Sequence, residues 1–561
     1  MNKKSSTLSG GQILADQLRA ENVDTVFCVP GESHLALLDG LYQHRNTIKV
    51  VSTRHEGGAA NMTEAYGKLT GRPGICLVTR GPGATHASAG LHTGFQDSTP
   101  MILLIGQVGR SMVDREAFQE IDYRRMFGEI AKWVAQIDDA ARIPEYVSQA
   151  FHRATSGRPG PVVLALPEDM LTDKANAQII PAAQPVQAAP PPEAMAELRV
   201  RLESAERPLL IVGGPTWTAK AVADMTTFVE ANGLPVAASF RCQDCYDNRL
   251  ENYVGDVGIA VNPKLSAAIN DSDLLIAAGP RLGEMTTQGY NLIDIPVPQQ
   301  EFVHIHAGVE ELGRVYAPTL AINASMPAFA AAARAMPPVD GRRWRTRLEE
   351  LRASYLKHIV PTELPGAINL GKIVSHLSNT LPEDAIITCG AGNYTIWVHR
   401  FFQHKMFRTQ LAPTSGAMGY GVPSAITAKL IEPERMVVSF SGDGCFQMYG
   451  QELATAVQQK APVVFIIANN GMFGTIRMHQ ERNYPERVIA TKIQNPDFTA
   501  LAQAYGAHGE LVTKTEDFAA AFDRAVESGK PAVIELQIDP EASTPVQTLS
   551  EARESGLGAN T

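Results

Sequence analysis

Short apolar runs alternate with stretches of helical periodicity along most of the chain. The runs have the length and β-branched content of buried parallel strands. They fall into three groups along the sequence: 25–29, 48–52, 74–78, 101–105 and 161–166; 208–212, 235–238, 274–277 and 302–305; and 385–389, 436–441, 463–468 and 532–537. Strands that alternate with helices in this way predict parallel sheets covered by helices.

Two stretches of different composition separate the three groups. Residues 176–195 are rich in proline and alanine and should run extended over the surface. The second group ends at a proline-containing stretch, 335–341, which a charged helical pattern follows. We therefore predict an α/β fold of three consecutive doubly wound parallel-sheet domains, at residues 8–175, 196–335 and 366–545.

The stretch 439–471 brings polar residues to the ends of two predicted strands. An apolar run over 435–441 leads into Gly-Asp-Gly at 442–444, which we expect to form a tight turn. A helical pattern follows from 448 to about 459, and the next strand ends at two asparagines and a glycine. The whole stretch is predicted to be one βαβ unit.

The polar residues of this unit suggest a metal-diphosphate site. Ligands in a doubly wound sheet gather at the carboxyl ends of the strands, so Asp443 and Asn470 should face the same crevice. One carboxylate and one amide oxygen suit Mg²⁺, which is usually held by one or two protein groups plus substrate phosphates. Gly442 and Gly444 would let backbone N–H groups approach phosphate oxygens. The alternative is that Gly-Asp-Gly is an ordinary turn.

Composition excludes several other classes of protein. A chain of 561 residues exceeds what one hydrophobic core normally supports, and 44% hydrophobic with 19% charged residues describes an ordinary soluble globular protein. The net charge of −10 argues against nucleic-acid or anionic-membrane partners. We find neither a secretory signal nor an apolar run long enough for a membrane span, and expect a cytoplasmic location.

The cysteines agree with a reducing compartment. The chain has 6 cysteines, mostly on or beside predicted buried strands, which suits reduced thiols. Cys242 and Cys245 have C-x-x-C spacing but lack a second pair for zinc and a thioredoxin-like context. A redox or metal role for this pair is therefore disfavoured.

The Gly-Asp-Gly and Asn-Asn pattern resembles the diphosphate signature of thiamine-diphosphate-dependent enzymes. Three consecutive α/β domains also match the pyrimidine-binding, middle and diphosphate-binding order of the acetolactate synthase and pyruvate decarboxylase class. The resemblance implies thiamine diphosphate and Mg²⁺ as cofactors, with Asp443, the Asn470 side chain and the Met472 carbonyl holding the metal. It also implies that Glu56, in Arg-His-Glu-Gly-Gly, activates the cofactor's aminopyrimidine across a dimer interface. From its position alone, Glu56 could equally be a glutamate favoured at a helix N-terminus.

The same resemblance assigns the other cofactor contacts. Gly416 would accept from the 4′-amino group through its carbonyl, and Met418 would support the bent cofactor, although a plain core role for Met418 is the alternative. Segment 79–86 resembles the Gly-Pro-Gly turn that shapes the cofactor wall. The remaining predicted cofactor-binding residues are Gly390, Gly392, Asn393, Gly442, Gly444, Cys445 and Ile476.

Four positions bear on the substrate. Gln119, in Phe-Gln-Glu, resembles a segment of acetohydroxyacid synthases, whereas Glu32 sits where pyruvate decarboxylases carry a catalytic aspartate. Glu32 could instead be a solvated loop acid. Ile476 replaces the late catalytic glutamate of the decarboxylases, which should leave the carbanion to be captured by a second carbonyl. His479 replaces a tryptophan of the synthases, and could also be a surface residue of a mobile lid.

We therefore expect a homo-oligomeric enzyme, at least a homodimer and preferably a homotetramer. It should decarboxylate a small 2-oxo acid and ligate the carbanion to an aldehyde or keto acceptor, as acetolactate synthases do. The alternatives are a simple 2-oxo acid decarboxylase and an aldehyde lyase of the benzaldehyde lyase kind; an inactive cofactor-binding regulatory protein is disfavoured. FAD in the middle domain is a doubtful prediction. Acetohydroxyacid synthases carry an Arg-Phe-Asp-Asp-Arg pattern in their flavin segment, and only Arg281 remains of that pattern here.

Overall fold

The structure is a computed structural model that describes residues 7–559. The chain up to Val186 together with Ile426–Ile431 forms one compact unit. A second compact unit consists of Gln187–Ala425 and the chain from Glu432 onward. No helix among the described residues has the length and apolar content that crossing a membrane requires.

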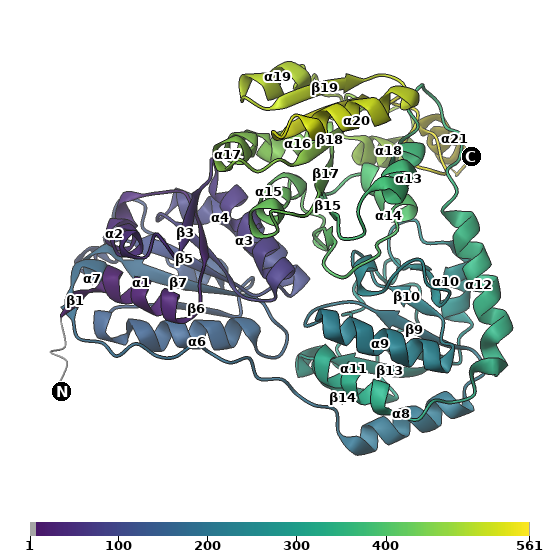
Figure 1. The fold of residues 1–561 in the computed structure, drawn as a ribbon, viewed down its shortest axis with the longest axis horizontal. Helices are drawn as coiled ribbons and strands as arrows, with labels where there is room; N and C mark the ends of the chain where they lie inside the picture. The colour runs from purple at the N-terminus through teal and green to yellow at the C-terminus, as the bar shows by residue number, and fades with distance from the viewer. Residues whose placement is uncertain (1–6, 560–561) are drawn as a thin grey trace. The chain divides into compact units, whose positions relative to one another are not determined.

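The first unit is built on a six-stranded parallel sheet in the order β3-β2-β4-β5-β7-β6 (Figure 1). Its strands are β2 (Thr25–Cys28), β3 (Lys49–Ser52), β4 (Gly74–Val78), β5 (Met101–Gln107), β6 (Trp133–Gln136) and β7 (Pro161–Pro167), beside a small pair, β1 (Leu8–Ser9) and β8 (Lys174–Ala175). The helices are α1 (Gly10–Ala20), α2 (Leu35–Gln43), α3 (Glu56–Thr70), α4 (Pro82–Asp97), α5 (Tyr123–Phe127), α6 (Ile143–Thr155) and α7 (Glu168–Thr172). Helices α1 and α6 share one hydrophobic core with one face of the sheet, and α3 contacts the other face through Tyr66 and Phe27.

The second unit contains two further six-stranded parallel sheets. The middle sheet, in the order β11-β10-β9-β12-β13-β14, consists of β9 (Pro208–Val212), β10 (Val236–Ala238), β11 (Tyr253–Asp256), β12 (Leu274–Ala278), β13 (Glu301–His306) and β14 (Leu320–Asn323). Its helices are α8 (Pro192–Ser204), α9 (Ala219–Asn232), α10 (Pro263–Asn270), α11 (Met326–Ala335) and α12 (Arg345–His358). Two separate hydrophobic cores cover the two faces of this sheet.

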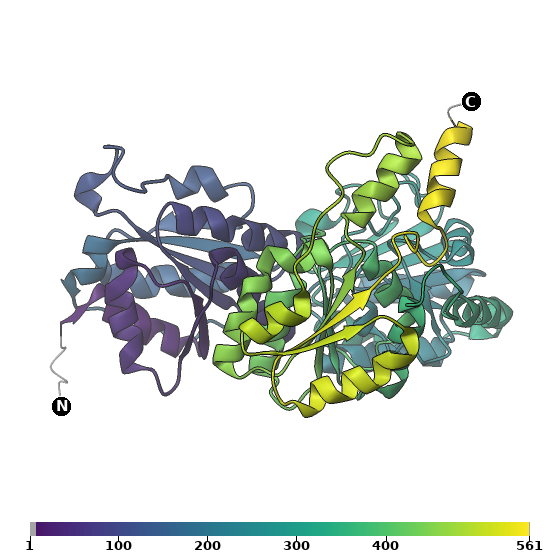
Figure 2. The ribbon, with the colours of Figure 1, turned by 90° about the horizontal axis from the view of Figure 1, so that it is seen from above.

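The third sheet has the order β16-β15-β17-β18-β20-β19. Its strands are β15 (Ile386–Cys389), β16 (Gln410–Leu411), β17 (Val437–Gly442), β18 (Val464–Asn469), β19 (His508–Val512) and β20 (Ala532–Gln537). The helices are α13 (Leu370–Thr380), α14 (Tyr394–Phe401), α15 (Gly421–Ile431), α16 (Asp443–Tyr449), α17 (Leu453–Gln459), α18 (Gly474–Asn483), α19 (Phe498–Ala504), α20 (Phe518–Glu527) and α21 (Leu549–Ala559). Figure 2 shows the last of them, α21, at the C-terminal end of the described chain.

The predicted fold class is confirmed, and two local predictions are wrong. Strand β17 includes Gly442, and helix α16 begins at Asp443, so residues 442–444 are not a tight turn and the helix starts before 448. The short side chain and carboxylate of an aspartate suit the first turn of a helix, which explains why the flanking glycines misled the prediction. The predicted extended linker also ends early, because α8 begins at Pro192.

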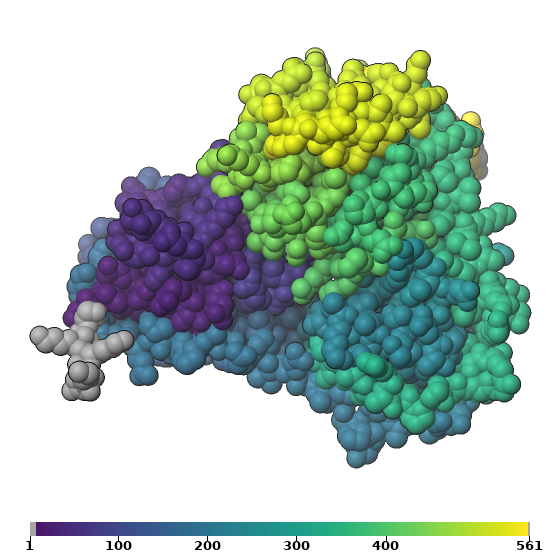
Figure 3. All heavy atoms as spheres, in the orientation of Figure 1, coloured from purple at the N-terminus to yellow at the C-terminus, as the bar shows by residue number. Residues whose placement is uncertain are grey.

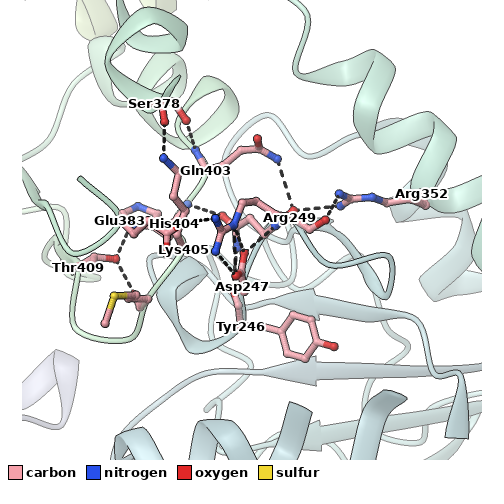
Figure 4. A network of polar contacts seen from close by, with 12 residues as sticks. Tyr246, Asp247, Arg249, Arg352, Ser378, Glu383, Gln403, His404, Lys405 and Thr409 are labelled. Atoms are coloured by element: carbon pink, nitrogen blue, oxygen red, sulfur yellow. Dashed lines mark hydrogen bonds and ion pairs between the residues drawn. The ribbon is translucent and has the colours of Figure 1, made fainter. Parts of the chain in front are cut away.

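The middle and third sheets are joined by polar contacts within the second unit. Asn248 donates its backbone N–H to the His404 carbonyl at 2.9 Å, and its side-chain oxygen accepts the His404 N–H at the same distance. Figure 4 shows Asp247 and Arg249 beside Glu383 and Gln403, and Arg249 forms an ion pair with Glu383. In the space-filling view the teal middle domain and the green segment of the third sheet adjoin (Figure 3). These contacts fix the loop that follows β10.

Candidate active site

Asp443 lies at the carboxyl ends of two neighbouring central strands, β17 and β18. Its Oδ1 accepts the N–H of Gly444 at 2.9 Å, and its Oδ2 accepts the N–H of Gly471 at 2.9 Å. The side-chain amide of Asn495 donates to the same Oδ2 at 2.7 Å. Burial raises the pKa of the Asp443 carboxyl, and these hydrogen bonds oppose the shift. The carboxylate is thus held in one orientation by three donors.

Three asparagines surround this carboxylate. Asn470 follows β18, and its Oδ1 accepts the N–H of Met472 at 3.2 Å. The Asn469 Oδ1 accepts from Asn495 Nδ2 at 2.8 Å, and its own amide donates to Glu535 at 2.7 Å. The sequence analysis identified Asn470 but missed Asn495, which comes from a loop 52 positions beyond Asp443.

A cavity of about 250 Å³ opens beside Asp443 in the second unit. All three residues predicted to hold the metal line it: Asp443, Asn470 and Met472. The predicted cofactor-binding residues that line it are Gly392, Asn393, Gly416, Met418, Gly442, Gly444, Cys445 and Ile476. Gly390 does not line the cavity, but its N–H donates to the hydroxyl of Tyr394, which does.

The backbone of this cavity fits a diphosphate and its metal. A Cβ built on Gly444 would lie 2.6 Å from the Phe473 ring, and one on Gly392 would lie 3.0 Å from the Tyr394 ring. Side chains at these glycines would therefore displace the walls. The donor set of one carboxylate and one amide oxygen matches the oxygen ligation that Mg²⁺ prefers. The residues present fit a Mg²⁺-diphosphate group.

Further polar contacts stiffen the cavity wall. Thr475 donates to the Asn393 side-chain oxygen at 2.9 Å, and the Asn393 amide donates to Ser543 at 3.2 Å. The Cys445 Sγ accepts the N–H of Gly419 at 3.0 Å and lies 3.3 Å from the Tyr394 hydroxyl. The aromatic lining residues Tyr394 and Trp397 were missed, since their helical pattern reads as an ordinary core helix.

The first unit holds a cluster around Glu56, the first residue of α3. The Glu56 Oε2 lies 2.9 Å from the Nδ1 of His86, and 13% of the Glu56 side chain is exposed. His55 caps the helix by accepting the Gly57 N–H at 3.0 Å, and its ring stacks on that of His86 at 4.6 Å. Burial and the nearby His86 lower the pKa of His55. His86 therefore holds the Glu56 carboxylate, a contact that the sequence did not reveal.

The other predicted catalytic residues of this unit have clear surroundings. Glu32 opens a short 3₁₀ helix, is 68% exposed, and pairs with Arg80 at 3.1 Å. Arg80 also bonds Glu168 at 2.8 Å. Gln119 has a φ of +65° and packs against Gly81, where a Cβ would lie 2.7 Å from the Gln119 Cβ. Glu32 is therefore a largely solvated, ion-paired acid in this chain.

The two predicted positions on α18 differ in surroundings. Ile476 lines the cavity and is 55% exposed. His479 is exposed one turn further along the helix and does not line the cavity. The structure therefore brings Ile476, but not His479, to the cavity of the second unit.

The middle domain contains the residues considered for FAD and for metal. Arg281 Nε lies 3.5 Å from Glu311, so its charge is already compensated. Cys242 and Cys245 are free thiols at the N-cap and at the last residue of a short 3₁₀ helix, Gln243–Cys245. Among the described residues, the one group with metal-ligand geometry formed by histidine, cysteine and carboxylate side chains is His55, Glu56 and His86. FAD binding by the middle domain stays a prediction.

Comparison with known proteins agrees with this geometry. Residues 8–126 match the N-terminal binding domain of thiamine pyrophosphate enzymes, 195–333 their central domain, and 390–536 their C-terminal binding domain. The chain is 30% identical over 549 residues to acetolactate synthase isozyme 2 large subunit of Escherichia coli, covering 95% of this chain and 96% of that protein. It is 31% identical over 559 residues to the acetolactate synthase large subunit of Corynebacterium glutamicum, covering 95% of this chain and 87% of that protein. The chain therefore belongs to the thiamine-diphosphate-dependent enzymes, in the group related to acetolactate synthase large subunits.

Proposed function

We propose that this protein decarboxylates a 2-oxo acid and joins the retained fragment to a second carbonyl compound, using thiamine diphosphate and Mg²⁺. The names of its relatives support the acetolactate-synthase-like form of this reaction. When bound, thiamine diphosphate supplies the nucleophilic carbon that attacks the 2-oxo acid and retains the fragment after CO₂ leaves. Everything else must come from the chain's own residues.

Asp443, Asn470 and the Met472 carbonyl are proposed to hold the metal, and Glu56 to activate the cofactor. The support for the first group is its common position on one cavity, with Asp443 oriented by three hydrogen bonds. The support for Glu56 is its family segment and its contact with His86. We also propose at least a homodimer, in which Glu56 serves the cofactor of a second copy, on the strength of the family resemblance.

The lack of a free carboxylic acid or a basic side chain in the part of the cavity wall that the structure describes supports the choice of ligation. Of the described residues that line this cavity, Asp443 is the sole carboxyl group, and none is lysine, histidine or arginine. Asp443 is occupied by its three donors and by the proposed metal role. The position of a late acid in decarboxylases is apolar Ile476. A wall without a free acid would protonate the retained fragment slowly and leave time for a second carbonyl to react.

Product analysis tests this proposal. The enzyme loaded with thiamine diphosphate and Mg²⁺ is incubated with pyruvate alone, and we expect acetolactate as the main product. Acetaldehyde as the main product would favour a simple decarboxylase. The Glu32 segment, which resembles that of pyruvate decarboxylases, supports this alternative. A Glu56→Gln variant should lose most turnover in either case, so an active variant would refute the proposed role of Glu56. A matched screen of other 2-oxo acids, with and without an aldehyde acceptor, defines the substrate pair.

A further inference from the structure

Arg241 is a buried arginine without a carboxylate partner. It lies in the loop after β10, is 6% exposed, and has a backbone φ of +61°. That conformation is uncommon for a residue with a side chain and is strained. The loop therefore holds Arg241 in place at some expense in stability.

The charge of Arg241 is poorly compensated. Its Nη1 donates to the Pro413 carbonyl, and its guanidinium lies 4.8 Å from the centre of the Phe240 ring. Its Nε is buried without a hydrogen-bond partner, and no ion pair within 4.0 Å joins Arg241 to a carboxylate of the described chain. Arginine presents five N–H donors and stays protonated in proteins. An isolated buried cation is strongly unfavourable unless something pairs with it.

Two acids of the same domain do not compensate Arg241. Asp244 accepts the backbone N–H groups of Thr409 and Gln410 at 3.1 and 3.3 Å. Asp256 ends β11, which pairs with β10, and burial raises the pKa of its carboxyl to about 7 with no contribution from a cation. Neither acid supplies the missing negative charge.

Arg241 also stands next to the candidate cavity. The Pro413 carbonyl that it bonds also accepts the N–H of Gly416 at 3.0 Å, and Gly416 lines the cavity. The positive charge of Arg241 acts on Tyr394, another lining residue, and on His399, whose pKa is lowered by burial and by that charge. His399 is thus neutral and offers no compensation.

The loop that carries Arg241 is anchored on both sides. Gln243 donates its backbone N–H to the Gln410 side chain at 2.9 Å and its amide to the His399 carbonyl at 2.7 Å. Asn248 and Arg249 continue the same anchoring, and Figure 4 shows Arg249 beside Asp247 and Glu383. These contacts hold the backbone of the loop in place, so only the side chain of Arg241 has to move on binding.

We infer that Arg241 is the binding site for the carboxylate of the 2-oxo acid. The inference rests on the proposed function and assigns the substrate carboxylate to a charged residue that lies beside the cavity lining. The fork of Nε and Nη2 has no acceptor, and a carboxylate matches such a fork through two charge-assisted hydrogen bonds. Since Nε is buried, binding includes a rotation of the side chain toward the cavity. Neutral carbonyl compounds gain nothing from this contact.

The test compares oxamate, an unreactive carboxylate analogue of pyruvate, with its neutral amide, oxamide. Binding to the enzyme loaded with thiamine diphosphate and Mg²⁺ is measured by titration calorimetry for the wild type, Arg241→Met and Arg241→Lys. We expect Arg241→Met to weaken oxamate binding roughly 10- to 100-fold, the range of hydrogen bonds to charged groups. Arg241→Lys keeps the positive charge but loses the two parallel N–H donors of arginine, and it should weaken oxamate binding by about threefold or more. Oxamide binding and cofactor affinity should not change.

Arg352→Met is the matched control. Arg352 also donates to backbone carbonyls, those of Asn248 and Tyr253, packs on Tyr355, and is not among the residues that line the cavity. Figure 4 shows Arg352 beside Arg249, whose carbonyl it also bonds. Its replacement should lower the melting temperature without changing oxamate affinity, whereas Arg241→Met should leave the melting temperature unchanged or raise it. If Arg241→Met does not fold, the Arg241→Lys comparison decides.

Three results would overturn the inference: a wild type that does not bind oxamate, oxamate affinity that survives both substitutions, or cofactor affinity that falls in parallel with oxamate affinity. The last result would mean that Arg241 only supports the Pro413–Gly416 turn. Failure of the proposed function is recognised separately, as a wild type that binds oxamate but turns over no 2-oxo acid. The binding experiments remain decisive in that case.

Discussion

Asn495 offers a direct test of how the metal-binding carboxylate is held. Its amide nitrogen donates to Asp443 Oδ2 at 2.7 Å and to Asn469 Oδ1 at 2.8 Å. Asn495→Leu keeps the approximate shape of the side chain but removes both donors. The hydrogen bond to the carboxylate is worth about 1.5–3 kcal/mol and the neutral one about 0.5–1.5 kcal/mol, so the two sum to roughly 2–4.5 kcal/mol.

The effect on the metal should be separable from the effect on stability. Asp443 keeps the Gly444 and Gly471 donors in the variant, so the site survives with a less restrained ligand. Loss of a partner that orients a metal ligand typically weakens metal affinity by about 10- to 100-fold. We expect that range for the Mg²⁺ concentration at half-saturation, measured on EDTA-stripped protein at fixed thiamine diphosphate. The fluorescence of Trp397, which lines the cavity, gives a signal independent of turnover.

Asn232→Leu is the matched control for this experiment. The Asn232 side chain donates to Phe228 at 2.7 Å and accepts from Val339 at 2.8 Å, and is buried in the middle domain. Both variants should lose stability by a similar amount, but the control should keep the wild-type Mg²⁺ requirement. If Asn495→Leu shifts that requirement by less than about twofold while losing stability, the reasoning that Asn495 orients the metal ligand is refuted.

Two further outcomes follow from the same cavity. Gly444→Ala would place a Cβ 2.6 Å from the Phe473 ring. We expect this overpacking to cost about 1–3 kcal/mol of stability and to lower the affinity for the cofactor. The control is Gly283→Ala, where a Cβ has nothing within 4 Å, and it should leave thermal unfolding and cofactor binding unchanged. Burial raises the pKa of Asp443 in the folded chain above the value of about 3.9 that an aspartate has in the unfolded chain. Without metal, the folded state is therefore most stable against unfolding below a pH of about 3.9, and it loses stability as the pH rises through the folded pKa. Asp443→Asn also places an amide NH₂ against one of the three donors, and that cost does not depend on pH. The melting temperature of metal-free Asp443→Asn relative to that of the wild type should therefore rise from acid pH to pH 8; a relative melting temperature that falls over this range would contradict this sign.

The sequence predicted the centre of each sheet well and its edges poorly. Central strands such as β9 and β20 are buried on both faces, so they read as continuous apolar runs. Edge strands such as β19, with the sequence His-Gly-Glu-Leu-Val, carry polar and partly exposed residues and give no such run. Strands β6 and β14 were missed for the same reason, since each contains positions that are not buried.

The site was predictable where one supersecondary unit carries it. Asp443 and Asn470 end neighbouring strands, so their spacing alone places them at one edge of the sheet. Asn495 and His86 reach their carboxylates through tertiary packing, and no local pattern marks them. His479 shows the opposite case: the cavity meets only the first turn of α18, and a helix advances about 1.5 Å along its axis with each residue, so His479 lies beyond the lining and its role stays a prediction.

The contacts between the loop after β10 and the third sheet have a consequence for synthesis of the chain. Asn248 finds its partner His404 156 positions later, and Gln243 finds Gln410 167 positions later. At the usual pace of about 5–20 residues per second, these polar side chains of the loop wait roughly 8–33 s for their partners to be synthesised. A nascent chain that stops before residue 399 should therefore bind chaperones or aggregate, even though all strands of its middle sheet have been made.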